Sequence, residues 1–420
     1  MNRRTAGGDV VRTRPEPVGV RALGAAGLAV TAAGILGNGL AYVAPVLAAR
    51  QLDAADLSAL ATALGLIAIA SVPGFGLQLA VAVHHARHGH SDTRRAALVT
   101  ATLCAGALVV ATPLLTTALR LPVEVSILSA VTTAAIVLAC RPLGELQGGQ
   151  RFVRLAVGMV LLAVGRYGGV LVGLLLGLGL TGSLLLGAVS AVLTPLALAV
   201  LARPATATAA PAAPALGAGR ILTGCGATLA MLVVSYADLL LARQLLPAGD
   251  AGAYAVGTVL TKGALWAPQV ATVLALPRLA RGDRRSRTVA LALTGGCGLL
   301  LVLASASAGG LAFRLAGGTD YTHLGGYAPL FAAVGALYAV VFVLLNAAVA
   351  AGVRWPAAPL WVGSVVLVVT AVSIAPRTVA GLLWCALGTA VVMTLTMAVR
   401  AWLTPPGAGQ PASPGVRGHG

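Results

Sequence analysis

The chain has 420 residues, of which 58% are hydrophobic and only 9% are charged, and its mean hydropathy is +0.94. Soluble domains have about 25% charged residues, so this composition excludes an ordinary soluble protein. Apolar runs of about 20 residues can each cross a bilayer as a helix, whereas open strands would leave backbone groups unpaired in lipid. We therefore expect an all-α integral membrane protein.

The cysteines give no sign of a metal site or a disulfide framework. The chain contains no CxxC motif and no Cys/His spacing typical of zinc ligands, so we expect no metal and no cofactor. The five cysteines fall one apiece in separate apolar runs or at their ends: Cys104, Cys140, Cys225, Cys297 and Cys385. We interpret them as small buried side chains.

Twelve membrane spans can be placed along the chain. Residues 1–22 are polar and basic, and we expect a disordered cytoplasmic N-terminus there. The run at 23–47 is too long for the core of a secretory signal, so we interpret it as an uncleaved first span. Eleven more spans are expected at 57–83, 96–118, 123–140, 155–180, 184–202, 221–241, 251–276, 289–311, 327–351, 357–374 and 379–402.

A linker divides the spans into two sets of six. Residues 203–220 are rich in Pro, Ala and Thr, a composition that suits a flexible connection. We expect a six-helix bundle at 23–202, a cytoplasmic linker at 203–220 and a second six-helix bundle at 221–403. The Pro/Gly-rich tail at 404–420 is expected to be disordered.

The distribution of arginine predicts the orientation. With a cytoplasmic N-terminus, the inner segments hold 21 arginines and the outer segments hold five. This bias follows the positive-inside rule, and it accounts for most of the net charge of +17 without a nucleic-acid partner. We expect a multi-pass membrane protein with both termini cytoplasmic, and the high Ala, Gly and Arg content with a single lysine suggests the plasma membrane of a bacterium.

A short repeat relates the two halves. The sequence at 49–52, Ala-Arg-Gln-Leu, recurs at 242–245, which is 193 positions later, and a turn containing acidic residues follows each copy. Six spans separate the copies, so both hairpins lie on the outer face and the halves are parallel repeats. Transporters built in this way place their substrate site between the halves, near the membrane midplane.

Several short motifs resemble those of bacterial polysaccharide-biosynthesis flippases. Gly37-Asn38 and the hairpin at 48–64 are similar to the opening of that family, and the run at 237–260 is similar to the start of its second half. The segments Gly74–Leu77, Gln150–Phe152 and Pro277–Leu279 also resemble family features. The resemblance covers roughly residues 23–402, and each motif is short.

This resemblance implies the multidrug/oligosaccharidyl-lipid/polysaccharide (MOP) exporter superfamily. Its Wzx-type members move lipid-linked oligosaccharides across the plasma membrane, and its other branches include MATE drug exporters and lipid II flippases. The resemblance implies a MATE-like fold of two six-helix bundles, a lipid-linked glycan as substrate, and membrane lipids and glycan-assembly proteins as partners.

Two cations inside spans are candidate substrate ligands. Charges inside a membrane span cost ~3 kcal/mol each on insertion scales, so they are functional candidates by default. Lys262, the only lysine, and Arg166 each lie twelve residues into a span, which is roughly 18 Å deep. Such a pair suits a pyrophosphate or an acidic sugar. Alternatively, each cation pairs with a backbone carbonyl, a lipid headgroup or Asp238.

Two further polar residues complete the candidate site. Asn38 is placed on the sugar pathway because the first span is expected to face the cleft, although a hydrogen bond between helices would also explain it. Asp238 is a candidate for ion coupling, because burial favours its protonated form. A local pairing of Asp238 with Lys262, Tyr236 or Arg243 is the simpler interpretation.

The chain has no large loop with paired carboxylates, no Ser/His/Asp set and no nucleotide-binding motif, so we expect no enzyme activity. We expect a transporter that flips a lipid-linked oligosaccharide from the inner to the outer leaflet by alternating access. One alternative is a MATE-like cation-coupled antiporter for drugs or metabolites. Another is a non-transporting component, glycosyltransferase or polymerase of a glycan-assembly complex.

Overall fold

The computed structural model describes the backbone of residues 20–88, 93–203, 218–279, 284–350, 353 and 355–403. Side chains at 20–27, 87–88, 218–224, 267–279, 284–287 and 350 are not described. The expected disordered ends therefore fall almost entirely outside the described residues, as does the greater part of the linker.

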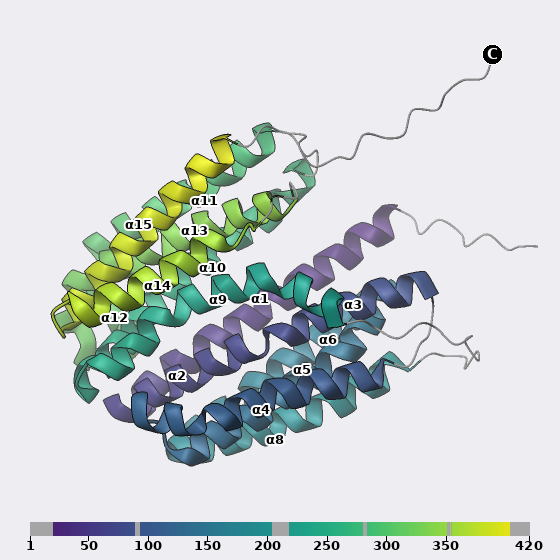
Figure 1. The fold of residues 1–420 in the computed structure, drawn as a ribbon, viewed down its shortest axis with the longest axis horizontal. Helices are drawn as coiled ribbons and strands as arrows, with labels where there is room; N and C mark the ends of the chain where they lie inside the picture. The colour runs from purple at the N-terminus through teal and green to yellow at the C-terminus, as the bar shows by residue number, and fades with distance from the viewer. Residues whose placement is uncertain are drawn as a thin grey trace, which may run out of the picture.

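The helices form two bundles that lie side by side (Figure 1). The first bundle contains α1 (Val20–Gln51), α2 (Ala54–Ala70), α3 (Val72–His88), α4 (Arg94–Ala118), α5 (Val123–Gly148), α6 (Phe152–Ala163), a π-helical turn (Val164–Gly168), α7 (Gly169–Leu175) and α8 (Gly179–Ala202). The second contains α9 (Ala218–Leu245), α10 (Ala248–Leu279), α11 (Arg284–Ser307), α12 (Gly309–Gly317), a 3-10 helix (Thr319–Tyr327), α13 (Ala328–Ala350), α14 (Ala358–Ser373) and α15 (Val379–Leu403).

The all-α membrane architecture expected from the sequence is confirmed. Ten helices or joined helices within the described residues are long and apolar enough to cross a membrane. The two other expected spans correspond to α10, which has 32 residues, and to α14, which has 16. Each of the twelve expected spans therefore coincides with helical structure, although the division into domains at the linker stays a prediction.

The pair of helix bundles has two opposite ends, which we call the hairpin end and the linker end. The hairpin end carries the two Ala-Arg-Gln-Leu hairpins, residues 50–57 and 243–251, and lies at the left of Figure 1. The linker end is the opposite one, where α1 begins and where α8 and α15 end.

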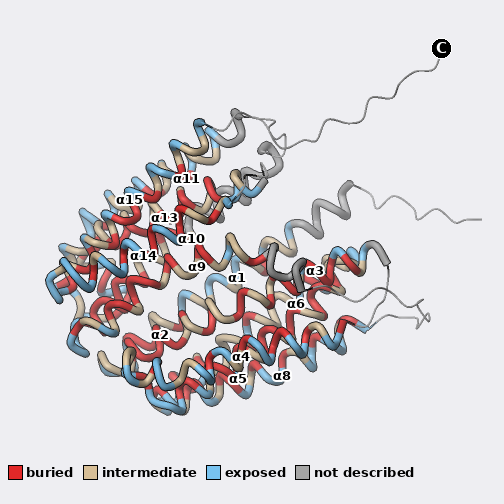
Figure 2. The backbone as a smooth tube through the Cα atoms, in the orientation of Figure 1, coloured by how far each residue is buried: buried red, intermediate tan, exposed pale blue. Residues whose placement is uncertain are grey.

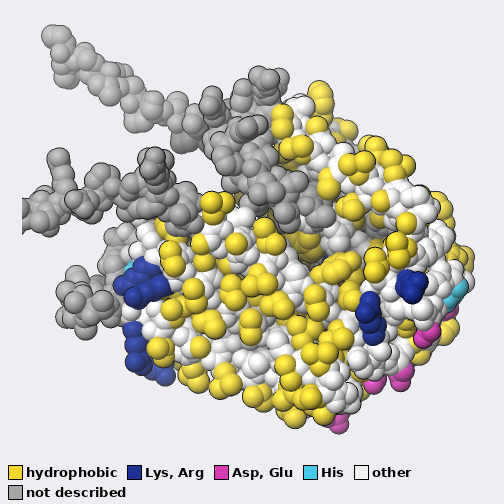
Figure 3. Space-filling model, turned by 180° about the vertical axis from the view of Figure 1, so that it is seen from behind, with side chains coloured by type: hydrophobic (Ala, Val, Ile, Leu, Met, Phe, Trp, Pro, Cys, Tyr) yellow, Lys and Arg dark blue, Asp and Glu magenta, His cyan; other side chains and the backbone are white. Residues whose placement is uncertain are grey.

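The outer surface of the bundles is apolar. Buried residues face the inside of each bundle, and exposed positions line the periphery (Figure 2). Val110 on α4 is 81% exposed and Leu300 on α11 is 68% exposed. In Figure 3 hydrophobic side chains fill the middle of the face, basic ones lie at both ends, and acidic ones lie at the hairpin end. A hydrocarbon core between two aqueous layers fits this distribution.

Three of the expected spans are interrupted, and one of them, expected at 289–311, is divided between α11 and α12 at Ala308. The span expected at 57–83 consists of α2 and α3, which meet at Ser71. Pro73 explains the break, because proline has no N–H to donate and its ring clashes with the carbonyl four residues earlier. The hydroxyl and the backbone N–H of Ser71 both donate to the carbonyl of Ile67, at 2.6 Å and 3.0 Å. The span expected at 155–180 contains the π-helical turn and ends at α7.

The largest apolar core joins the two bundles. Leu57 and Leu60 of α2 belong to the same buried cluster as Tyr254 of α10 and Phe331 of α13. The rings of Tyr254 and Phe331 pack edge to face with their centroids 5.2 Å apart. The two bundles therefore meet through packed side chains.

Candidate functional site

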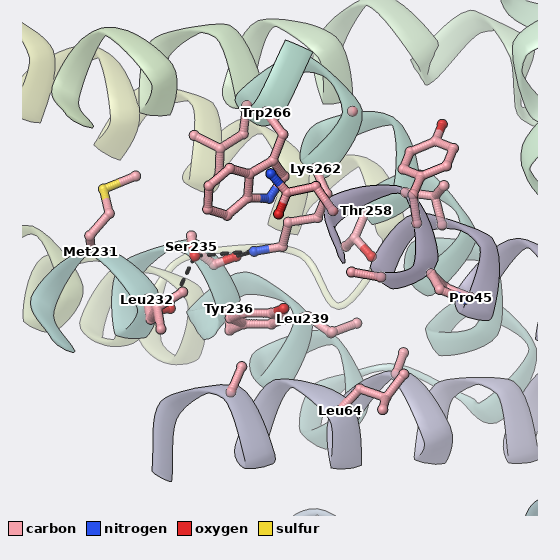
Figure 4. Close-up of a pocket in the computed structure, with 18 of the residues that line it drawn as sticks. Pro45, Leu64, Met231, Leu232, Ser235, Tyr236, Leu239, Thr258, Lys262 and Trp266 are labelled. Carbon is pink, nitrogen blue, oxygen red and sulfur yellow. Dashed lines mark hydrogen bonds between the residues drawn. The ribbon is translucent and has the colours of Figure 1, made fainter. Parts of the chain in front are cut away.

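A cavity of about 350 Å³ lies between the two bundles (Figure 4). Residues of α1, α2, α3 and the π-helical turn line one side, and residues of α9, α10 and α13 line the other. Its volume is within the range of small-molecule sites, about 300–1,000 Å³. Asn38, Arg166 and Lys262 all line this one cavity, although they lie far apart in the sequence.

Helical spacing explains how the lining residues reach the cavity. Thr258, Lys262 and Trp266 are four residues apart on α10, so they lie on one face of the helix. Asn38 and Tyr42 have the same spacing on α1. These polar and aromatic stripes interrupt otherwise apolar helices and point between the bundles.

Lys262 is held by backbone, hydroxyl and aromatic groups. Its Nζ donates to the carbonyl of Ser235 at 2.5 Å and contacts the Ser235 hydroxyl at 3.1 Å. The same Nζ lies 3.5 Å from the centroid of the Tyr236 ring, a distance at which a cation is attracted to the ring face. Figure 4 shows Ser235, Tyr236 and Lys262 converging on one side of the cavity. The carbonyl pairing considered for Lys262 is therefore present.

Tyr236 is positioned by a glycine of the other bundle. A Cβ atom on Gly65 of α2 would lie 2.7 Å from Cδ1 of the Tyr236 ring, which is too close for any larger residue without movement. The ring therefore lies against α2, while Lys262 approaches it from α10 (Figure 4). One aromatic side chain thus links the first bundle to the cation of the second.

Arg166 enters the cavity from the π-helical turn. Such turns are often found at functional sites. The Ser190 hydroxyl of α8 donates to the carbonyl of Gly165 at 2.6 Å and so satisfies an acceptor in the turn. The Arg166 guanidinium carbon lies 5.0 Å from the centroid of the Tyr167 ring. Nε of Arg166 is buried and has no hydrogen-bond partner among the described residues.

Asn38 and Tyr42 form the α1 side of the cavity. Asn38 is exposed and makes no hydrogen bond to a described residue, so its amide is open to the cavity that it lines. A Cβ on Gly263 would lie 3.2 Å from Cε2 of Tyr42, which places α1 close to α10. The first span therefore faces the cavity, as the position assigned to Asn38 requires.

Asp238 lies behind the cavity wall rather than in it. The side chain is 1% exposed, and its carboxylate accepts from the Tyr254 hydroxyl at 3.1 Å and from the backbone N–H of Leu239 at 2.9 Å. Among the described residues no ion pair within 4.0 Å joins Asp238 to Lys262 or Arg243. The side chain that hydrogen-bonds Asp238 is therefore Tyr254, while Lys262 lies near enough for its charge to interact with the carboxylate without a direct contact.

Two further polar residues within the spans, Gln78 and Asn346, make hydrogen bonds to other groups of the protein. Gln78 donates to Gln147 at 3.1 Å across α3 and α5, and Asn346 donates to the carbonyl of Phe342 in its own helix at 2.7 Å. These contacts are hydrogen bonds between or within helices.

Sequence reasoning missed the aromatic character of the site. Six of the chain's seventeen aromatic residues (5 Phe, 5 Trp and 7 Tyr) line this cavity. They are Tyr42, Phe75, Tyr167, Tyr236, Trp266 and Phe342. Aromatics make up only 4% of the chain, so their position beside Asn38, Arg166 and Lys262 at helical spacing was a usable signal. No described residue in the lining is acidic.

Comparison with solved structures identifies the fold. A MATE protein in complex with MaL6 has a TM-score of 0.57 and 14% identity, covering 90% of this chain and 96% of that chain. The Vibrio cholerae MATE transporter VcmN in the bent form has a TM-score of 0.53 and 14% identity, covering 90% and 95%. The outward-facing conformation of a multidrug resistance MATE family transporter of the MOP superfamily also has a TM-score of 0.53, with 15% identity and the same coverage.

The chain therefore has the fold of MATE transporters. No protein-family model matches the sequence, and no curated protein matches it significantly.

Proposed function

We propose that the protein is an alternating-access transporter that moves an anionic, lipid-linked oligosaccharide from the cytoplasmic to the outer leaflet. The cavity between the bundles would receive the charged head group and its first sugars. The prenyl tail would remain in the surrounding lipid. The MATE-like fold supports transport, and the chemistry of the cavity supports the anionic substrate.

The proposal rests mainly on one observation, the Nε of Arg166, which is unpaired within the described part of the chain and belongs to a side chain that lines the cavity. The guanidinium lines the cavity, its Nε has no hydrogen-bond partner among the described residues, and no acidic residue is described in the lining. Arginine has five N–H donors and no acceptor, so it needs carbonyl, carboxylate or phosphate oxygens. A buried donor without a partner costs about 1–3 kcal/mol, and an anion that the guanidinium turns to meet would remove this cost.

Lys262 supplies the second positive charge. Two of its contacts are to Ser235, and the third is to the Tyr236 ring. A phosphate oxygen could replace the ring contact while the Ser235 bonds remain. Charge-assisted hydrogen bonds contribute about 1.5–3 kcal/mol each. A pyrophosphate has enough oxygens to contact Arg166 of one bundle and Lys262 of the other.

The aromatic residues suit the sugar part of the substrate. The C–H face of a pyranose ring packs on an aromatic ring, and the amide of Asn38 can both donate and accept hydrogen bonds to hydroxyls. Tyr42 lies on the same wall as Asn38. A lining of this kind binds an amphiphilic head group better than a fully apolar or a fully charged cavity would.

A flipping assay with purified protein in liposomes tests the proposal. The probe is a fluorescent polyprenyl-pyrophosphate-linked N-acetylglucosamine. We expect Lys262→Gln and Arg166→Gln each to lower the flipping rate at least tenfold, which is about 1.4 kcal/mol. Arg154→Gln is the matched control, because Arg154 is exposed and outside the cavity lining.

The controls also determine which results would contradict the proposed function. The control variant should flip the probe at the wild-type rate, and all variants should elute as the wild type does in gel filtration. If wild-type protein does not flip the probe, or if both cavity variants flip it normally, the proposal is wrong.

A cation-coupled drug antiporter is the second candidate, favoured by the MATE-like fold and by the buried Asp238. Its neighbour Leu239 lines the cavity and donates its backbone N–H to the Asp238 carboxylate, so protonation of Asp238 could be sensed there. This candidate predicts ethidium export driven by a proton or sodium gradient and lost in Asp238→Asn. The glycolipid flippase predicts no ethidium export by the wild type.

A further inference from the structure

A second, separate groove lies on the surface of the second bundle between α14 and α15. It has a volume of about 500 Å³. On α15 it follows Cys385, Gly388, Val392, Thr396 and Arg400, which form one stripe along the helix. From Cys385 to Arg400 the groove extends about 22 Å along α15, more than half of a hydrocarbon core about 30 Å thick.

Between its ends the groove presents an apolar surface, because two of its threonine hydroxyls are paired within their own helices. The hydroxyls of Thr370 and Thr396 donate to carbonyls of their own helices, Val366 and Val392, each at 2.8 Å. Val362 and Val392 are 63% and 61% exposed, so the groove opens to the outside of the bundle. An apolar, outward-facing groove of this length suits a hydrocarbon chain.

The equivalent helix pair of the first bundle is closely packed at its glycines. The last two spans there are α6–α7 and α8, and glycines bring their backbones together. A Cβ on Gly173 would lie 2.5 Å from Cα of Ser183, and one on Gly169 would collide with the carbonyl of Leu186. On α15, by contrast, a Cβ on Gly388 would meet no atom within 4 Å. The groove therefore stays open on the outer side of α15, at Gly388.

One end of the groove has the character of a membrane–water interface. Arg400 lines the groove at the linker end, together with Ala358 at the start of α14. Trp402 is 82% exposed and Trp355 is 73% exposed, and the carbonyl of Trp355 accepts from the N–H of Ala358. Exposed tryptophans mark the level of the lipid head groups. Arg400 thus lies where a lipid phosphate would be.

We propose that this groove binds an anionic phospholipid, with one acyl chain between α14 and α15 and the head group at Arg400. The positive charge at one end and the apolar stripe beneath it match the two parts of such a lipid. Anionic lipids also concentrate in the cytoplasmic leaflet, on the side to which the arginine bias assigns the linker end. The site is independent of the cavity between the bundles and of the substrate proposed for it.

Native mass spectrometry of the full-length protein tests the site. The protein is titrated with phosphatidylglycerol and, separately, with phosphatidylcholine. We expect the wild type to retain at least one phosphatidylglycerol at energies that strip phosphatidylcholine. Gly388→Leu fills the groove, and we expect it to lower the affinity for phosphatidylglycerol at least tenfold. Gly296→Leu on α11 is the matched control, because Gly296 is equally exposed and its Cβ would also meet no atom within 4 Å.

A second variant separates the head group from the chain. Arg400→Gln should remove the preference for phosphatidylglycerol and leave the weaker binding of phosphatidylcholine unchanged. The proposal is overturned if Gly388→Leu and Gly296→Leu retain lipid equally. It is also overturned if the wild type is a dimer that Gly388→Leu dissociates, because a helix of a second copy would then occupy the groove.

Discussion

The two copies of Ala-Arg-Gln-Leu have the same sequence but make different contacts. Arg50, in the first copy, is exposed and donates one hydrogen bond, to the carbonyl of Leu315 on α12 at 3.2 Å. Arg243, in the second copy, is half-buried and donates to three carbonyls of the first bundle. These are Ala55 at 2.7 Å, Leu119 at 3.0 Å and Arg120 at 3.1 Å.

The two copies thus share a sequence, as repeats of one unit do, but no longer make the same contacts. Each arginine reaches into the opposite bundle at the hairpin end, as a parallel repeat requires. Only Arg243 gathers two separate segments, the start of α2 and the turn between α4 and α5. Arg120 adopts a left-handed backbone conformation, with φ at 51°, in that turn. The link between the bundles at the hairpin end is therefore asymmetric, and it depends mainly on the second copy.

Loss of Arg243 is expected to have the largest effect. Arg243→Ala removes three charge-assisted hydrogen bonds and leaves partly buried carbonyls unpaired, so we expect it to lower the free energy of unfolding by about 2–4 kcal/mol. Thermal unfolding in detergent measures the change. Arg243→Lys keeps the charge but loses the planar fork that reaches three acceptors, so it should restore less than half of the loss. Full restoration by lysine would show that charge alone matters.

Overpacking at the second hairpin is expected to have the next largest effect. A Cβ on Gly252 would lie 2.6 Å from Cβ and O of Ala54 in the first hairpin. Gly252→Leu should therefore push the hairpins apart and cost about 1–3 kcal/mol of stability. Gly249→Leu, one turn earlier, is the control, because its Cβ would meet no atom within 4 Å. Equal melting temperatures of the two variants would contradict the close approach.

Loss of Arg50 is expected to matter less. It makes a single exposed hydrogen bond, and interactions of exposed charges contribute about 0–1 kcal/mol. Arg50→Ala should thus lower the melting temperature by a small fraction of the change in Arg243→Ala. If the two single variants are equally destabilised, the asymmetry between the copies is not energetic.

The smallest expected effect is the coupling energy between Arg50 and Arg243. Arg50 and Arg243 share no hydrogen-bond partner. The double variant should therefore equal the sum of the single variants within about 0.5 kcal/mol. A larger coupling energy, measured by a double-mutant cycle in the same unfolding assay, would show that the two arginines act as one unit.

The sequence predicts much of the fold, because membrane helices are coded by the length and polarity of apolar runs. The interruption at Ser71 follows from Pro73, whereas the short α12 and the 3-10 helix before α13 were not predicted because they lack the length that identifies a span. The π-helical turn at Val164–Gly168 was also missed, since a π turn has no distinctive composition.

The candidate site was predictable in part. A costly charge inside a span is visible in the sequence, so Arg166 and Lys262 were identified, and equal depth suggested that they could meet. Their neighbours were harder to predict. The Gly65–Tyr236 contact and the Tyr254 partner of Asp238 depend on how α2, α9 and α10 are rotated, and periodicity in a helix that is apolar all round does not reveal this.

The π-helical turn also affects how this chain can be aligned with other sequences. A π turn is closed by hydrogen bonds from i to i+5, so it contains one residue more than the α-helical turn it replaces. Each residue rotates a helix by about 100°, so a homologous span without the extra residue would present a different face beyond this point. A one-residue gap near Arg166 is therefore physically reasonable in the middle of the span, where alignment methods usually forbid gaps.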